Sequence, residues 1–259
     1  MRVIDLHTHP IFLRAGRRRA DVDRLVAESR ARGVVRMVVL GDVLVHGRTP
    51  DAGQIARIND ETARVVRMHP DFFLGFCYLN PLLGARAVER EVERCVAGYD
   101  FRGLKLELAN NALHPSMTPV MRLAARLSLP VLQHTWRTRP GPERRQQSDP
   151  EDTVALARRF PGVQVIMAHL TACGYRGVLE AKGVDNLVID TSAAFPEAEI
   201  LEYAVAQLGA ERVVYGSDLP IREPAVTLGR VLGSRLTAAE RRLILHDNAQ
   251  RLLRLSPPC

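Results

Sequence analysis

Lysine and aromatic residues are scarce in this chain of 259 residues. Only Lys105 and Lys182 are lysines among 36 basic residues, and aromatic side chains make up 5% of the sequence. No run approaches the roughly 20 consecutive apolar residues of a membrane-spanning helix. The N-terminus reaches Val3 and Ile4 without a preceding apolar signal segment, so we expect a cytoplasmic protein with no membrane partner.

Cysteine is also sparse, and its positions show no paired spacing. The four cysteines are Cys77, Cys95, Cys173 and Cys259. The absence of a Cys-x-x-Cys pair argues against a zinc knuckle and against a disulfide framework. We therefore expect free thiols in a reducing compartment.

The chain does have a large apolar fraction, 46%, and a net charge of +7. So high an apolar fraction excludes a disordered chain, and the length allows one large domain. The arginines are scattered, with one tight run at Arg17-Arg18-Arg19, and a bias towards arginine codons explains the basic excess better than nucleic-acid binding does. We expect a small-molecule substrate and no nucleic-acid partner, and a homodimer stays open.

Short β-branched runs alternate with stretches of helical period along the whole chain. The predicted strands are Val3–Leu6, Val34–Leu40, Phe72–Leu79, Gly103–Leu106, Pro130–Gln133, Val163–Ala168, Leu187–Asp190 and Val213–Tyr215. The predicted helices are Asp21–Arg32, Gln54–Met68, Ala85–Ala97, Thr118–Leu127, Pro150–Phe160, Pro196–Leu208, Ala225–Leu232 and Thr237–Leu253.

Eight strand–helix units in about 250 residues are typical of a TIM barrel. We predict the α/β class, as a distorted TIM (β/α)8 barrel with closing C-terminal helices, over residues 1–259 as a single domain. The alternative is an open doubly wound sheet, which usually carries a glycine-rich first turn. The first turn here is His7-Thr8-His9-Pro10, without glycine.

Polar residues gather at the C-terminal ends of the predicted strands, the face that carries the active site of a barrel. They are His7, His9, Lys105, His134, His169, Asp190 and Asp218. Four of the eight histidines are among them. We assign no role to His46, His69 and His114, and a structural role to His246.

Histidine and carboxylate at one barrel mouth point to a metal site. His7 and His9 are separated by one residue, so in extended backbone both imidazoles point to the same side and can share a divalent ion. His134 and His169 can complete the shell, and Asp218 can bind metal and accept a proton. This donor set suits zinc, with manganese, iron or nickel as alternatives.

Each of these residues alone has a simpler explanation. A His-x-His pair at a strand end is often a polar turn, His134 alone could be a hydrogen-bonded core residue, and Asp218 alone could belong to a turn. Their joint occurrence at the strand ends of one barrel favours the metal site.

Lys105 lies at a predicted strand end among histidines, in a chain that uses arginine almost everywhere that it needs a cation. Its amine can lose a proton when desolvated or close to a metal, which a guanidinium cannot. It could orient a substrate carboxylate, donate a proton, or be carboxylated to bridge two metals. A surface lysine is the simpler alternative.

The segment Thr135–Asp149 is long for a barrel loop and follows a predicted site residue, which indicates a lid. It contains Trp136 and Arg137, followed by Arg139, Arg144 and Arg145. These side chains suit an anionic, carboxylate-bearing or aromatic substrate, although arginine is common throughout this chain. Arg222, just after the eighth predicted strand, is a further candidate for substrate binding.

Several motifs together resemble one protein family. They are Ile4-Asp5-Leu6-His7-Thr8-His9, Arg102-Gly103-Leu104-Lys105-Leu106, Leu129-Pro130-Val131-Leu132-Gln133-His134-Thr135, Phe160-Pro161-Gly162 leading to Ala168-His169-Leu170, Asn186-Leu187-Val188-Ile189-Asp190-Thr191-Ser192, Val214-Tyr215-Gly216-Ser217-Asp218-Leu219-Pro220 and Asp247-Asn248-Ala249-Gln250-Arg251-Leu252-Leu253. In this order they resemble the amidohydrolase superfamily, in particular the amidohydrolase-related branch that contains aminocarboxymuconate-semialdehyde decarboxylase-like proteins.

The resemblance implies a distorted TIM barrel with a metal-dependent hydrolase or lyase site. It implies that one metal ion is bound by four ligands: His7, His9, His134 and Asp218. It makes His169 a ligand of a second metal or a group that polarises the substrate, and Asp218 also the general base. Lys105 matches the carboxylated lysine of binuclear members. Glu107 departs from the histidine often found after the lysine motif, which puts the substrate contacts of that loop in doubt.

These observations predict a metal-dependent hydrolase of an amide, lactone or ester, with catalytic roles for Asp218, His169 and Lys105. The alternative is a non-oxidative decarboxylase that uses the same metal site. A phosphoesterase of the PHP type also begins with His-x-His but would normally add a histidine in the first loop, and Pro10–Ala20 contains none. A non-catalytic barrel would have no need of five metal-competent residues.

Overall fold

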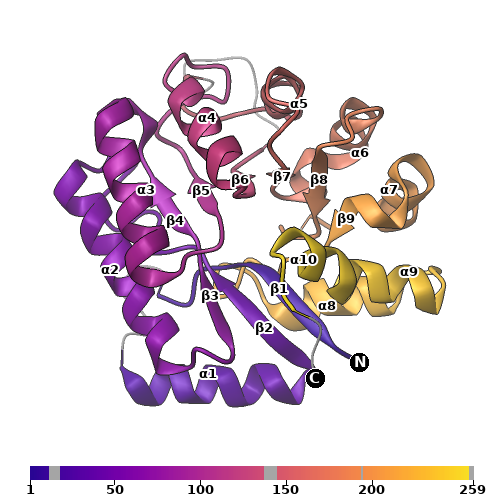
Figure 1. Ribbon diagram of the computed structural model, residues 1–259. Helices are drawn as coiled ribbons and strands as arrows, with labels where there is room; N and C mark the ends of the chain where they lie inside the picture. The colour runs from indigo at the N-terminus through magenta and orange to yellow at the C-terminus, as the bar shows by residue number, and fades with distance from the viewer. Residues whose placement is uncertain (12–17, 137–144, 194, 257–259) are drawn as a thin grey trace.

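A computed structural model describes residues 1–11, 18–136, 145–193 and 195–256 (Figure 1). The strands are β1 (Val3–Thr8), β2 (Val34–Val39), β3 (Phe73–Gly75), β4 (Cys77–Leu79), β5 (Leu104–Leu106), β6 (Val131–Gln133), β7 (Val165–Met167), β8 (Leu187–Asp190) and β9 (Val213–Val214). The α-helices are α1 (Arg19–Ala31), α2 (Ala52–Met68), α3 (Ala85–Tyr99), α4 (Met117–Leu127), α5 (Pro150–Arg159), α6 (Leu170–Ala181), α7 (Ile200–Leu208), α8 (Pro224–Leu232), α9 (Ala238–Arg242) and α10 (Asn248–Leu252).

All strand pairs are parallel and follow chain order, as a sheet β1-β2-β3 and a sheet β4-β5-β6-β7-β8-β9. The two sheets join at Phe76, between β3 and β4, whose N–H donates to the Val39 carbonyl at 3.1 Å. The circle closes where the Leu6 N–H donates to the Tyr215 carbonyl at 3.0 Å. The helices surround the strands (Figure 1), which confirms the predicted TIM barrel.

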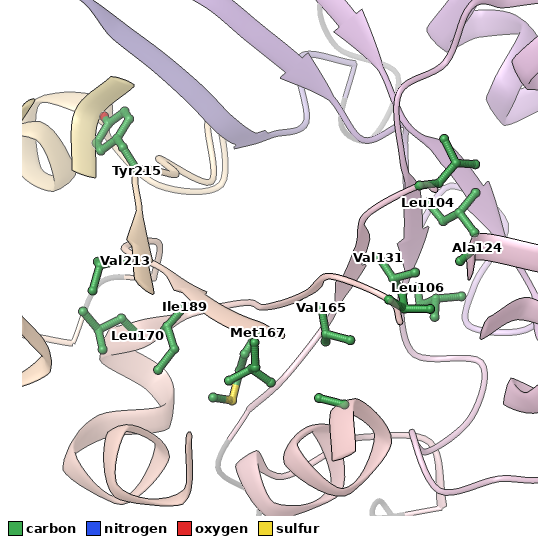
Figure 2. Close-up of a cluster of buried hydrophobic side chains, with 14 of the residues drawn as sticks. Leu104, Leu106, Ala124, Val131, Val165, Met167, Leu170, Ile189, Val213 and Tyr215 are labelled. Atoms are coloured by element: carbon green, nitrogen blue, oxygen red, sulfur yellow. The ribbon is translucent and has the colours of Figure 1, made fainter. Parts of the chain in front are cut away.

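The apolar core has an inner and an outer part. Inside the barrel, side chains such as Ile4, Leu6 and Ile166 pack together. Ala249 of α10 and Leu253, the residue after α10, pack against this inner cluster. Outside, the alternate residues of the same strands face the helices. Figure 2 shows this outer layer, with Val165 and Met167 of β7 in a row of strand residues beside Leu170. Both strand faces are therefore buried, which explains the near-continuous apolar runs of the sequence.

Some elements differ from the sequence expectations. The third predicted strand is divided at Phe76, and α6 occupies residues for which no helix was predicted. Gly174 in α6 has a non-helical φ of 64°, and this kink weakens the helical period of its sequence. The last predicted helix, Thr237–Leu253, contains the π-helical turn η5 (Leu243–Asp247) between α9 and α10. The predicted helix Pro196–Leu208 begins only at Ile200.

Short 3₁₀-helical turns, η2 (Pro81–Leu83) and η4 (Ala210–Arg212), lie between the longer elements. None of the helices in the described parts of the chain combines the length and the apolar character needed to cross a membrane.

Candidate metal centre

The structure brings His7, His9, His169 and Asp218 together at the C-terminal mouth of the barrel. The Nε2 atoms of His7 and His9 are 3.3 Å apart. Oδ1 of Asp218 lies 3.7 Å from Nε2 of His7 and 3.8 Å from Nε2 of His9. Oδ2 of Asp218 lies 4.0 Å from Nε2 of His169. His7 lies on β1 and His9 just after it, and the other two residues lie in the segments after β7 and β9, so barrel closure assembles the cluster.

Oxygen atoms behind each ring fix the orientation of these imidazoles. The Nδ1 contacts are His7 with Oδ2 of Asp190 at 2.7 Å, His9 with the Gly41 carbonyl at 3.0 Å, and His169 with the Thr135 carbonyl at 2.9 Å. Because these oxygens accept hydrogen bonds, the proton of each neutral ring lies on Nδ1 and the Nε2 lone pair faces the cluster. Such a set of nitrogens beside a carboxylate fits a divalent metal ion.

Burial tunes the protonation of this cluster. Burial lowers the pKa of His9 and of His169 well below the usual range, and the electrostatic effects of His7 on His9 and of His134 and His7 on His169 act in the same direction. Burial also raises the pKa of Asp218, against the opposing effect of His7. Neutral imidazoles are the form that binds metal, so the site is prepared for ligation near neutral pH.

The backbone is strained at two of these residues. His169 has φ 73° and Asp218 has φ 63°, in the left-handed region that costs about 1–2 kcal/mol for a residue with a side chain. The Asp218 N–H donates to the His7 carbonyl at 2.8 Å. At Gly216 a Cβ would lie 2.7 Å from Cβ of His7, so only glycine lets these segments approach so closely. Strain of this kind clusters at functional sites.

Asp190 contacts the candidate site, and the sequence analysis gave it no role. Besides its contact with His7, its Oδ1 accepts the N–H groups of His169 and Ser192, each at 3.0 Å, and the Ser192 hydroxyl. Burial alone would raise the pKa of Asp190, but His7 and these hydrogen bonds hold it well below its usual range. The carboxylate therefore stays charged and orients His7 from behind. The only feature of the sequence that pointed to Asp190 was its position at the end of a predicted strand.

His134 lies beside this cluster and is held by a different carboxylate. Its ring centroid is 4.8 Å from that of His169. Its Nδ1 lies 2.9 Å from Oε1 of Glu107, and Oε2 of Glu107 lies 2.9 Å from Nζ of Lys105. Burial raises the pKa of Glu107, but His134 and Lys105 outweigh it and bring that pKa well below the usual range. None of the distances given above between His7, His9, His169 and Asp218 involves His134.

The Lys105 side chain is completely buried. Its ion pair with Glu107 lacks the angle of a hydrogen bond, and within the described part of the chain the ammonium has no hydrogen-bond partner. The charge of Lys105 lowers the pKa of His9 and of Asp218, which places it close to the proposed metal donors. N–H donors of the ammonium thus remain for an anionic group at the barrel mouth.

Of the residues predicted to bind substrate, Trp136 lies at the site. Its ring is 5.3 Å from that of His169, 6.3 Å from that of His134 and parallel to it, and 5.6 Å from that of Phe195, which the sequence analysis did not single out. The N–H of Arg222 donates to the Asp218 carbonyl at 2.9 Å, and the buried Nε of Arg222 has no partner among the described residues. Arg137, with Arg139 and Arg144, lies outside the described residues.

Comparison with known proteins places the chain in a family. A family model described as amidohydrolase matches residues 4–255, so this chain belongs to the amidohydrolase family that its motifs resembled. A search of curated protein sequences finds no match.

Among solved structures, the barrel is similar to those of two kinds of decarboxylase. They include 2,6-dihydroxybenzoate decarboxylase from Rhizobium (TM-score 0.76, 20% identity, 98% of this chain and 99% of that one) and dihydroxybenzoic acid decarboxylase from Polaromonas sp. JS666 (0.75, 19%, 99% and 98%). They also include 5-carboxyvanillate decarboxylase from Sphingomonas paucimobilis (0.73, 16%, 98% and 99%). The Polaromonas structure holds manganese and the inhibitor 2-nitroresorcinol.

Proposed function

We propose that this protein is a metal-dependent, non-oxidative decarboxylase of an aromatic or muconate-type carboxylic acid. The observation that carries the proposal is the buried ammonium of Lys105 beside the imidazole cluster, which has no hydrogen-bond partner among the described residues. A buried cation with free donors favours an anionic ligand, and a substrate carboxylate supplies one. The aromatic ring of Trp136 beside His169 offers a surface for a planar substrate.

Hydrolysis of an amide, lactone or ester was the first expectation from the sequence, and decarboxylation its alternative. The same residues could serve either reaction. Decarboxylation is now preferred, because it requires a carboxylate next to the reacting carbon and because similar barrels belong to benzoate-type decarboxylases. A neutral amide or ester would offer the Lys105 ammonium only an uncharged acceptor, which forms a weaker hydrogen bond than a carboxylate does.

The proposed reaction uses this chain's groups as follows. Lys105 binds the carboxylate, and Trp136 packs against the ring. The Asp218 carboxyl, whose pKa is raised by burial, delivers a proton to the ring carbon that bears the carboxylate. The bond between that carbon and the carboxylate then breaks, its electron pair returns to the π system of the ring, and carbon dioxide leaves.

The two oxygens of Asp218 face different partners, since Oδ1 lies towards His7 and His9 and Oδ2 towards His169. One oxygen can therefore contribute to ion binding while the other handles the proton. A divalent ion held by these residues would supply Lewis-acid stabilisation of negative charge on the substrate oxygens. We propose zinc or manganese as that ion, and a single ion per chain, because a Lys105 carboxylated to bridge two metals would place a second negative charge beside Glu107.

The test is a product analysis. The purified protein, loaded with Mn²⁺ or Zn²⁺, is incubated with hydroxylated benzoic acids, muconate-type acids, lactones and amides. Release of carbon dioxide without uptake of oxygen from isotopically labelled water is the expected result. Incorporation of solvent oxygen into the product, without carbon dioxide, would overturn the decarboxylase proposal in favour of hydrolysis.

A further inference from the structure

Two of the four imidazoles at the barrel mouth are held by buried carboxylates, and two by backbone carbonyls. His7 is paired with Asp190 at 2.7 Å, and His134 with Glu107 at 2.9 Å. Both carboxylates are almost completely buried, Asp190 at 0% and Glu107 at 8% exposure. The two pairs thus share one arrangement, in which a carboxylate oxygen lies next to Nδ1 of the imidazole.

The local backbone explains why Glu107 can make both of its contacts. Lys105 and Glu107 are two residues apart in an extended segment, so their side chains lie on one side. Leu106 pairs with Gln133 in the neighbouring strand, and the His134 N–H donates to the Leu106 carbonyl at 2.9 Å. This register brings the imidazole of His134 next to Glu107.

We propose that Glu107 is a positioning residue that orients His134 towards the metal centre and holds Lys105 beside it. One carboxylate oxygen faces each partner, so a single side chain fixes the imidazole and the cation relative to one another. The inference rests on the proposed function only for the role of Lys105. For His134 it depends on metal binding alone.

A carboxylate behind a metal-binding imidazole makes it a stronger ligand and fixes its direction. Glu107 would therefore do for His134 what Asp190 does for His7. On this view the departure of Glu107 from the histidine of similar proteins affects the metal site as well as the substrate contacts.

The experiment compares Mn²⁺ affinity, measured without substrate from the electron paramagnetic resonance signal of free Mn²⁺, in three variants. Glu107→Gln keeps the size of the side chain but removes the charge, and Asp190→Asn does the same behind His7. We expect both to weaken Mn²⁺ binding by about 10- to 100-fold. Glu91→Gln, which removes a largely buried carboxylate paired with Arg94 on α3, is the matched control and should bind Mn²⁺ as the wild type does.

A second substitution at this position, Glu107→Asp, keeps the negative charge but shortens the side chain by one methylene. It should recover part of the Mn²⁺ affinity, and it serves the same comparison if Glu107→Gln does not fold. With an identified substrate, Glu107→Gln should also raise KM, because Lys105 is no longer held.

Glu107→Gln with wild-type Mn²⁺ affinity and a lowered unfolding temperature would overturn the proposal and leave a structural role only. A wild type that binds Mn²⁺ yet decarboxylates nothing would overturn the proposed function, while the affinity comparison still decides the role of Glu107. A wild type that binds neither Mn²⁺ nor Zn²⁺ would overturn both.

Discussion

Two groups of metal-competent side chains lie in the described parts of the chain, and they differ in how their polar atoms are used. The first is the mouth cluster of His7, His169 and Asp218. The second, the thiol cluster, contains Cys77, Glu91 and Cys95 between β4 and α3. The donor atoms of each group lie within 4.8 Å of one another, so distance alone does not separate them.

In the thiol cluster, neighbouring protein groups already form hydrogen bonds with the polar atoms. Arg94 donates to both carboxylate oxygens of Glu91, at 2.9 and 2.7 Å. The Asn59 amide donates to Oε1 of Glu91 at 2.6 Å and to Sγ of Cys77 at 3.7 Å, and the thiol of Cys95 donates to Glu91 at 3.6 Å. In the mouth cluster, outer oxygens occupy the Nδ1 atoms and the Nε2 atoms converge. The comparison shows how a metal site is recognised: the fold fixes the direction of its ligand atoms but does not engage them in hydrogen bonds to the rest of the protein.

The largest expected difference between the clusters is in turnover. Asp218→Asn keeps a metal-binding oxygen but removes the proton donor, so kcat should fall by about 1,000-fold while metal content is retained. Glu91→Gln should leave kcat within about twofold of the wild type, since no step involves the thiol cluster. Steady-state rates and elemental analysis of both variants check this. Full activity of Asp218→Asn on an identified substrate would refute its assigned role.

The second-largest expected difference between the clusters is in how added metal stabilises the protein. An ion bound only by the folded protein, at 100 times its Kd, stabilises by about 2.7 kcal/mol, or about 5–10 °C in unfolding temperature for a chain of this size. We expect Mn²⁺ or Zn²⁺ to produce this shift in the wild type and in Cys95→Ala, but not in His169→Ala. Thermal unfolding with and without a chelator measures it. A shift that disappears in Cys95→Ala would move the metal site to the thiol cluster.

A cationic side chain lies beside each cluster, Lys105 at the mouth cluster and Arg94 at the thiol cluster. We expect the two cations to differ in their effect on substrate binding. Lys105 has no hydrogen-bond partner among the residues that the structure describes, whereas Arg94 is bonded to Glu91, Asp60, Tyr99 and the Ala56 carbonyl. A hydrogen bond to a charged group contributes about 1.5–3 kcal/mol, so Lys105→Met should raise KM for a carboxylated substrate by roughly 10- to 100-fold. Arg94→Met should lower the unfolding temperature and leave KM unchanged. Equal KM values in both variants would remove Lys105 from the substrate site.

The sequence predicted the barrel and its strand ends well, because a strand's apolar run and the polar residue after it are local features. His7, His169 and Asp218 were placed at one mouth in this way, although their roles as ligands stay predictions. The partners behind them were not predictable. His7 and Asp190 are 183 residues apart, and only the closed barrel shows that they meet.

Glu107 shows the same limit over a shorter distance. Its position two residues after Lys105 was visible, but its contact with His134 depends on the register between β5 and β6. Helix α6 was missed for a different reason, since the kink at Gly174 interrupts the period by which helices are recognised.

The smallest expected effect concerns thiol chemistry. Burial raises the pKa of the Cys77 thiol well above its usual value, and the neighbouring Cys95 acts in the same direction. The thiolate is the reactive form and is populated only as the pH approaches the pKa, so a raised pKa keeps Cys77 unreactive at pH 8 and through pH 9. Alkylation of the native protein followed by peptide mass analysis should leave Cys77 unmodified, and denaturant should expose it. Modification of native Cys77 at the rate of a free thiol would show that the thiol cluster opens to solvent, and would weaken the contrast between a satisfied interior network and an open site.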